Sequence, residues 1–182
     1  MRKNLLSVYK LPLLISTVLA IAFIAMKTAR YPLDIGLLVI GSYLGVVVLD
    51  LEYIIYAYVL EPEEDFSKTL VGFIKHKDYM NALSFIHYNK GEIKEKSLNS
   101  AIFQVVLAPV SILVIYATPS VFVKALVLSI FANTIYRLAE SYYEGKTDEW
   151  FWTFKKKPDK SGVIVYTFVL LCILAFCLIN FR

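Results

Sequence analysis

Two acidic residues stand near the end of a long apolar run in residues 41–53, where Asp50 and Glu52 follow a series of aliphatic side chains. A carboxylate inside a membrane helix costs about 2.5–3.5 kcal/mol at the centre of the span, and less near its edge. Asp50 therefore needs a cationic partner or a water-filled cavity. Arg137, which lies in a later apolar run, is the candidate partner.

Helix geometry brings these two charges to a similar depth. Asp50 lies 18 residues after Pro32, and Arg137 lies 18 residues after Pro119. Each proline stands where a helix would begin, a position that tolerates its missing N–H. At a rise of 1.5 Å per residue, both charges lie about 27 Å from the helix start. The spacing predicts an ion pair between two helices; the alternative is that Arg137 extends to the headgroups or pairs with Glu140 on its own helix.

The run that carries Arg137 also has a polar stripe. Ser129, Asn133, Arg137 and Glu140 are spaced by four, four and three residues, which places them on one helix face. A polar stripe on an otherwise apolar membrane helix faces protein or water rather than lipid. We therefore expect this face to point into the bundle.

The run that carries Asp50 has a G-x-x-x-G step at Gly41 and Gly45, which is typical of close packing by another membrane helix. Glu52 follows Gly45 by seven residues and falls on the same face. Asp50 and Glu52, two residues apart, point to nearly opposite faces of a regular helix. They would serve one site together only if the helix unwinds near Leu51.

The order of these polar residues resembles that of the small membrane-bound metal-dependent hydrolase family. Those proteins carry a D-x-D-H cluster at the end of an early span, a His-Ser at the inner start of a later span, and an H-x-x-x-D on the next helix. The corresponding places here, within about residues 40–140, hold Asp50-Leu-Glu52-Tyr53, Ser97-Leu-Asn99-Ser100 and Asn133-Thr-Ile-Tyr-Arg137. The resemblance implies a membrane helical bundle with a site at its inner end.

The departures from that pattern remove the metal ligands. Tyr53, Asn99 and Asn133 stand where the family has histidines, and Arg137 stands where it has an acidic ligand. A guanidinium has no lone pair to offer a metal. We therefore expect a degenerate relative in which an ion pair replaces the metal, with no catalytic residue, metal ligand or cofactor. The expected binding or structural polar cluster consists of Asp50, Glu52, Asn99, Ser100, Asn133, Arg137 and Glu140.

Composition places the chain among membrane proteins. Of its 182 residues, 58% are apolar types and 19% are charged, and the charges cluster between apolar runs. This predicts an all-α, polytopic membrane helical bundle that forms a single domain. Five transmembrane helices are expected at about residues 5–26, 33–58, 98–117, 120–143 and 163–181, with cytoplasmic interfacial helices in residues 61–96. Cys172 and Cys177 lie inside the last run and are expected to be small apolar residues.

The distribution of Lys and Arg predicts the orientation. With the N-terminus in the cytoplasm, the inner side holds 14 of these residues outside the spans and the outer side holds three. The C-terminus of this multi-pass cell-membrane protein is then on the opposite side. The aromatic patch at residues 150–152 suits the headgroup level, and the lysines at 155–157 beside it fit anionic headgroups rather than nucleic acid. The expected partners are the lipid bilayer and other membrane protein subunits.

Three functions compete on this sequence. The first is a non-catalytic scaffold or assembly subunit, which the missing histidines favour. The second is a membrane-bound metal-dependent hydrolase acting on a lipid or lipid-linked substrate, which requires bound metal and a cavity that reaches Asp50 and Glu52. The third is a small-solute transporter, which requires a continuous polar path across the bilayer.

Overall fold

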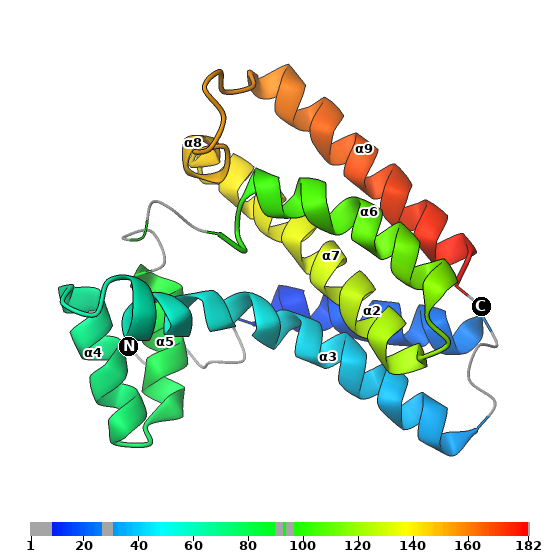
Figure 1. Ribbon diagram of the computed structural model, residues 1–182, viewed down its shortest axis with the longest axis horizontal. Helices are drawn as coiled ribbons and strands as arrows, with labels where there is room; N and C mark the ends of the chain where they lie inside the picture. Colours follow the sequence, from blue (N-terminus) through cyan, green and yellow to red (C-terminus); the bar gives the residue numbers. More distant parts are fainter. Residues whose placement is uncertain (1–8, 27–30, 90–92, 94–96, 182) are drawn as a thin grey trace.

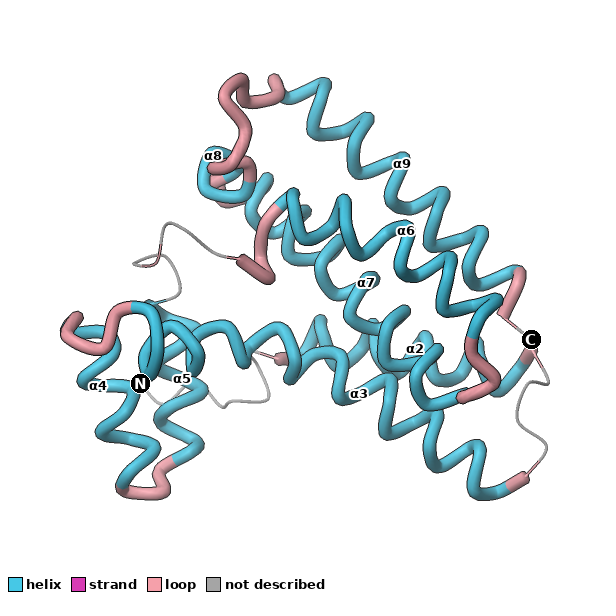
Figure 2. The backbone as a smooth tube through the Cα atoms, in the orientation of Figure 1, coloured by secondary structure: helices cyan, strands magenta, loops and turns pink. Residues whose placement is uncertain are grey.

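The computed structural model describes residues 9–26, 31–89, 93 and 97–181, and every regular element in these ranges is a helix (Figures 1 and 2). Residues 5–8 of the first expected span, and residues 90–92 and 94–96 of the segment expected to form interfacial helices, lie outside the described residues. The helices are α2 (Lys10–Ala25), α3 (Pro32–Ile55), the π-helical turn η1 (Tyr56–Leu60), α4 (Asp65–Lys75), α5 (Tyr79–Asn89), α6 (Ala101–Ala117), α7 (Val121–Tyr143), α8 (Thr147–Trp150) and α9 (Lys160–Ile179).

Three of the described helices are long and apolar enough to cross a membrane: α3 together with η1, α7, and α9. The other two predicted spans appear as the shorter apolar helices α2 and α6, of 16 and 17 residues. Pro32 occupies the first position of α3, as predicted, whereas Pro119 lies in the turn before α7, one residue ahead of the N-cap Ser120. The chain is thus an all-helical protein with three helices suited to a membrane, flanked by two shorter apolar ones.

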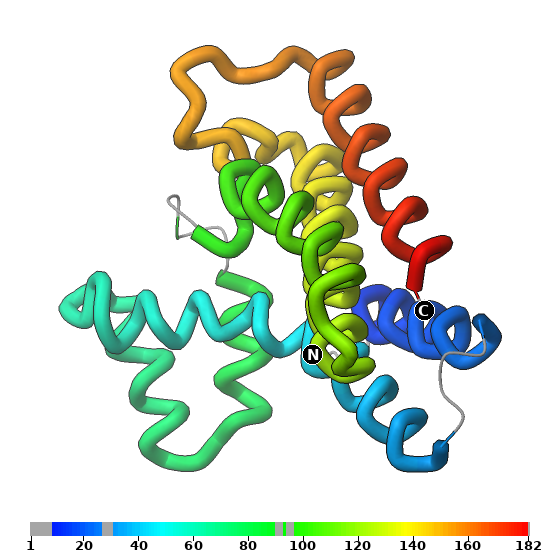
Figure 3. Tube along the Cα trace, turned by 45° about the vertical axis from the view of Figure 1, so that its right-hand side comes forward, coloured from blue at the N-terminus to red at the C-terminus, as the bar shows by residue number. Residues whose placement is uncertain are grey.

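Helix α7 lies at the centre of the bundle and packs against α2, α3, α6 and α9 (Figures 1 and 3). Its fully buried residues include Leu128, Phe131 and Leu138, which contribute to two apolar clusters along its length. One cluster contains Trp150 and Val163, and the other contains the Phe23 and Phe181 rings, which stack with centroids 4.2 Å apart. All of residues 128–135 are buried, so the middle of α7 is surrounded by the other helices.

The outward faces of the bundle are apolar. On α9, Phe168 is 65% exposed and Ile179 is 73% exposed, and similar side chains cover the outer faces of α2 and α6. Contiguous apolar exposure on this scale is unusual for a soluble monomer and typical of a surface that contacts lipid.

The glycine step of α3 contacts α7 closely, as predicted. A Cβ atom built on Gly41 would lie 2.8 Å from the carbonyl oxygen of Phe122, and one built on Gly45 would lie 2.8 Å from the backbone nitrogen of Ile130. These distances leave no room for any side chain. The two backbones approach because both positions lack a Cβ.

Helices α4 and α5 form a hairpin beside the end of α3, away from α9 (Figures 1 and 3). They pack on η1 around Phe66, Leu70 and Ile86, and α4 carries its apolar residues on one face. Short helices thus lie where interfacial helices were predicted in residues 61–96, and their place at the membrane interface stays a prediction.

The aromatic patch at residues 150–152 is mostly buried within the protein, and its predicted depth at the headgroup level stays a prediction. Trp150 and Phe151 are 5% and 4% exposed, and only Trp152 faces outward. The indole nitrogen of Trp150 donates to Gln104 Oε1 at 3.1 Å, and Phe151 packs edge-on against Tyr166. Local composition could not reveal this, because the contacts come from α6 and α9.

Candidate functional site

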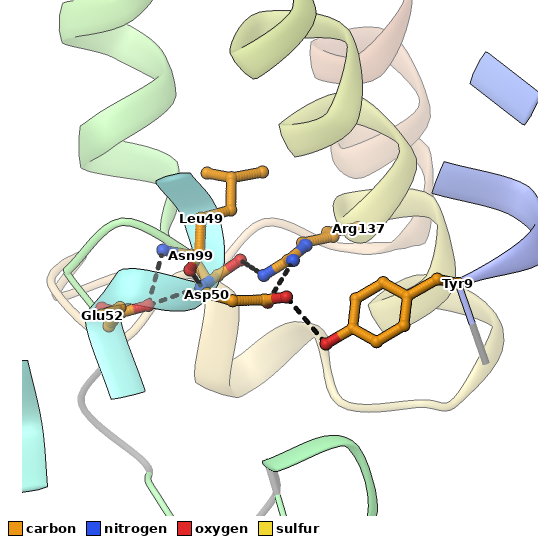
Figure 4. A network of polar contacts seen from close by, with 6 residues as sticks. All are labelled: Tyr9, Leu49, Asp50, Glu52, Asn99 and Arg137. Carbon is orange, nitrogen blue, oxygen red and sulfur yellow. Dashed lines mark hydrogen bonds and ion pairs between the residues drawn. The ribbon is translucent and has the colours of Figure 1, made fainter. Parts of the chain in front are cut away.

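Asp50 of α3 and Arg137 of α7 form an ion pair (Figure 4). Arg137 Nη2 lies 2.6 Å from Asp50 Oδ1, and the two side chains are 14% and 11% exposed. The pair predicted from helix spacing is therefore present. Because both side chains are largely removed from solvent, salt screens their attraction less than it would at a surface.

The second oxygen of Asp50 accepts a hydrogen bond from the hydroxyl of Tyr9, at 2.9 Å. Tyr9 is the residue just before α2. Sequence reasoning missed Tyr9, although the sequence held a signal. Tyr9 stands at the start of the first apolar run, and when two neighbouring helices are antiparallel the start of one lies beside the end of the other. A tyrosine with one apolar and one polar end suits that level.

Asn99 extends the network from the ion pair to Glu52. Arg137 Nη1 donates to Asn99 Oδ1 at 2.8 Å, and Asn99 Nδ2 donates to Glu52 Oε2 at 2.5 Å. The backbone N–H groups of Leu98 and Asn99 also donate to Glu52, at 2.8 and 3.2 Å. Glu52 thereby satisfies backbone donors just ahead of α6, where a negative charge is favoured.

Asp50 and Glu52 belong to one network without any unwinding of α3, so the predicted need for a break near Leu51 was wrong. The helix stays regular to Ile55, and the π-helical turn comes only afterwards. The two carboxylates are instead joined through Arg137 and Asn99, which lie on other helices or their leading segments (Figure 4). A bridging side chain connects groups that their own helix keeps apart.

The remaining members of the predicted cluster have other surroundings. Ser100 is the N-cap of α6: it accepts from the Phe103 N–H at 3.4 Å and donates to the Ser97 carbonyl at 2.6 Å. Asn133 lies one turn before Arg137 and takes part in a separate cluster. Glu140 lines a small polar cavity together with Asp50 and Arg137.

That separate cluster joins α2, α3 and α7 where the helices cross. The Ser129 hydroxyl donates to the Ser42 carbonyl, and Asn133 Nδ2 donates to the Ser129 carbonyl at 2.9 Å and to the Ser16 hydroxyl at 3.3 Å. These side chains are fully buried or nearly so. The polar stripe of α7 thus faces protein, as predicted.

The two carboxylates of the network offer hydrogen-bond acceptors, and the protein itself already uses these acceptors. Each of the four carboxylate oxygens of Asp50 and Glu52 accepts a hydrogen bond from the protein. In the part of the chain that the structure describes, no group of three or more His, Cys, Asp or Glu side chains is arranged to hold a metal. Beside the network, outside the apolar helices, the hydrogen bond from Lys146 to Glu144 raises the pKa of the lysine.

Comparison with protein-family models, with curated proteins and with solved structures found no match. The resemblance to membrane-bound metal-dependent hydrolases therefore stays a prediction. Function has to be argued from the contacts of this chain itself.

Proposed function

We propose that this chain is a non-catalytic integral membrane protein, a scaffold or assembly subunit, in which the Asp50–Arg137 pair takes the place of a metal site. One observation carries the proposal: every carboxylate oxygen of Asp50 and Glu52 already has a donor from the protein. A divalent cation would have to displace the guanidinium of Arg137, a fixed positive charge that offers no ligand atom.

The network connects helices to one another, which is a structural role. It ties the start of α2 to the end of α3, the start of α6 and the inner half of α7. Four segments far apart in the sequence meet at one largely buried point. Such a connection favours a defined helix arrangement, which is what a subunit that presents its surface to other membrane proteins requires.

Metal content is the direct test of this proposal. We expect protein purified without chelators to contain zinc and manganese at well below one atom per chain, measured by inductively coupled plasma mass spectrometry. The Asp50→Asn variant serves as the control and should give the same values. Stoichiometric zinc or manganese in the wild-type protein that disappears in this variant would overturn the proposal and favour a metal-dependent hydrolase.

We further propose that all five apolar helices cross the membrane, with the N-terminus in the cytoplasm and the C-terminus outside. The way in which the helix ends are grouped supports this arrangement. Tyr9, Asp50, Asn99 and Arg137 gather at one end. The opposite ends of α2 and α9 meet through Phe23 and Phe181. Helices α2 and α6 are about 24–26 Å long, close to the roughly 30 Å of a bilayer core.

Labelling of single cysteines tests this topology. In a Cys172→Ala/Cys177→Ala background, a cysteine in place of Glu63, between η1 and α4, should react with an impermeant maleimide only after the inner face is opened. A cysteine in place of Thr118, between α6 and α7, should react in intact cells, because that turn lies at the other end of the bundle. The reverse pattern would invert the orientation, and equal accessibility of both sites would contradict the five-span arrangement.

A further inference from the structure

The segment between α8 and α9 exposes aromatic and basic side chains side by side. Residues 152–160 contain four lysines and one aspartate, so positive charge is in excess. Two aromatic residues of the same segment, Trp152 and Phe154, are 38% and 43% exposed. The loop surface is defined here as the exposed side chains of Trp152, Phe154, Lys155, Lys156 and Lys160.

Buried neighbours hold the aromatic part of the loop surface in place. Trp150 and Phe151 are buried against α6 and α9. The Phe154 N–H donates to the Phe151 carbonyl at 3.0 Å, and the centroids of these two rings are 5.9 Å apart. The segment is therefore anchored from inside, and the turn that follows the anchor keeps Trp152 and Phe154 at the outside.

Three of the four lysines have no anionic partner among the residues that the structure describes. Lys157 pairs with Asp148 at 3.3 Å. The others, Lys155, Lys156 and Lys160, are exposed and make no ion pair with any described residue. The loop surface thus presents positive charges that the described part of the protein does not balance.

The loop surface lies directly before α9, which is the most apolar of the three helices that could cross a membrane. Only three of the 20 residues of α9 are buried in the protein. Asp159, its N-cap, accepts a hydrogen bond from the Gly162 N–H at 2.8 Å, so the helix begins at the end of this segment. Residues just before a membrane helix lie at the headgroup level, where tryptophan and lysine side chains are favoured.

We propose that the loop surface binds the headgroups of anionic phospholipids. Lys155 and Lys156 contact the lipid phosphates, and the rings of Trp152 and Phe154 lie between the headgroups and the first carbons of the acyl chains. The exposed rings and the apolar helix that follows favour a lipid over a soluble anion. This surface goes beyond the structural role proposed above and does not depend on it; it requires only that α9 enters the bilayer.

Quenching of Trp152 by brominated lipids tests the loop surface in the full chain reconstituted into vesicles. The vesicles contain equal amounts of phosphatidylglycerol and phosphatidylcholine with identical acyl chains, and only one of the two lipids carries bromine near the top of its chains. The protein has two tryptophans and Trp150 is buried, so the signal of a Trp152→Phe variant is subtracted as background.

We expect phosphatidylglycerol to be enriched beside Trp152 about fivefold over phosphatidylcholine. This is the ratio that one lysine near an anionic membrane surface produces. The enrichment should fall when NaCl is raised from about 0.1 M to about 1 M, because the screening length then drops from about 10 Å to about 3 Å.

Two variants assign the preference to particular lysines. Lys155→Gln/Lys156→Gln should bring the enrichment close to one. Lys75→Gln/Lys77→Gln removes the same charge from the exposed end of α4 and the turn after it, which lie away from α8 and α9 (Figure 1). This control should keep the fivefold enrichment.

Three results would overturn the inference. The first is equal quenching by the two brominated lipids in the wild-type protein. The second is an unchanged enrichment in Lys155→Gln/Lys156→Gln. The third is the absence of any quenching of Trp152, which would place the loop surface outside the bilayer and leave its lysines to a soluble anion. None of these results changes the metal content, so a failure here is distinct from a failure of the proposed function.

Discussion

Replacing Asp50 with asparagine is expected to lower the free energy of unfolding by about 3–5 kcal/mol, the usual cost of leaving one member of a buried ion pair without its partner. Asparagine has nearly the same shape: its oxygen can accept from Arg137 while its amide nitrogen donates to the Tyr9 hydroxyl, so both contacts can keep a hydrogen bond. The loss in the free energy of unfolding therefore reports the effect of removing the negative charge. Arg137 then stays 14% exposed with no carboxylate at 2.6 Å to balance it.

Denaturant titration in detergent micelles, followed by tryptophan fluorescence, measures this effect. Asp34→Asn is the matched control: it makes the same change in the first turn of the same helix, at the end opposite the network, and should change stability by less than about 0.5 kcal/mol. The exchange Asp50→Arg/Arg137→Asp should be less harmful than either single change, because it restores opposite charges. A double variant as unstable as the sum of the two would contradict a direct pair.

Replacing Gly45 with alanine is expected to destabilise the protein by about 1–3 kcal/mol, the usual cost of overpacking a tight contact. The added Cβ would overlap the Ser129 side chain and approach the backbone nitrogen of Ile130 to 2.8 Å. Backbone atoms cannot move aside alone, so α3 and α7 must separate. The Ser129–Ser42 hydrogen bond would be disturbed first, since it crosses the same contact.

Gly36 provides the control in the same helix. A Cβ built there meets nothing within 4 Å. Gly36→Ala should therefore be neutral or stabilising by up to about 1 kcal/mol, because alanine favours the helix. The two variants are compared by thermal unfolding in detergent. Equal effects at both positions would show that the glycine step is not a close contact in the folded protein.

These two predictions concern one crossing. The glycine step sets how closely α3 approaches α7, and five residues after Gly45 the same helix presents Asp50 to Arg137. An ion pair at 2.6 Å tolerates little displacement, so Gly45→Ala should also weaken the network. Combining Gly45→Ala with Asp50→Asn should therefore cost less than the sum of the single changes.

Much of this architecture follows from the sequence alone, and the reason is physical. Apolar runs, prolines at or just before helix starts and a G-x-x-x-G step are local patterns, and local patterns determine helix bounds and faces. They were enough to predict α3, α7 and α9, the close contact at Gly41 and Gly45, and the depth match of Asp50 with Arg137.

Only the tertiary structure decided which polar groups complete the network. Tyr9 binds Asp50, Asn99 bridges Arg137 to Glu52, and Trp150 folds inward onto Gln104. These partners are 38 to 47 residues apart in sequence, and no periodicity relates them. Their meeting depends on how helices cross in space, because a hydrogen bond requires an atom within about 3 Å and helix spacing along the chain does not specify position to that precision.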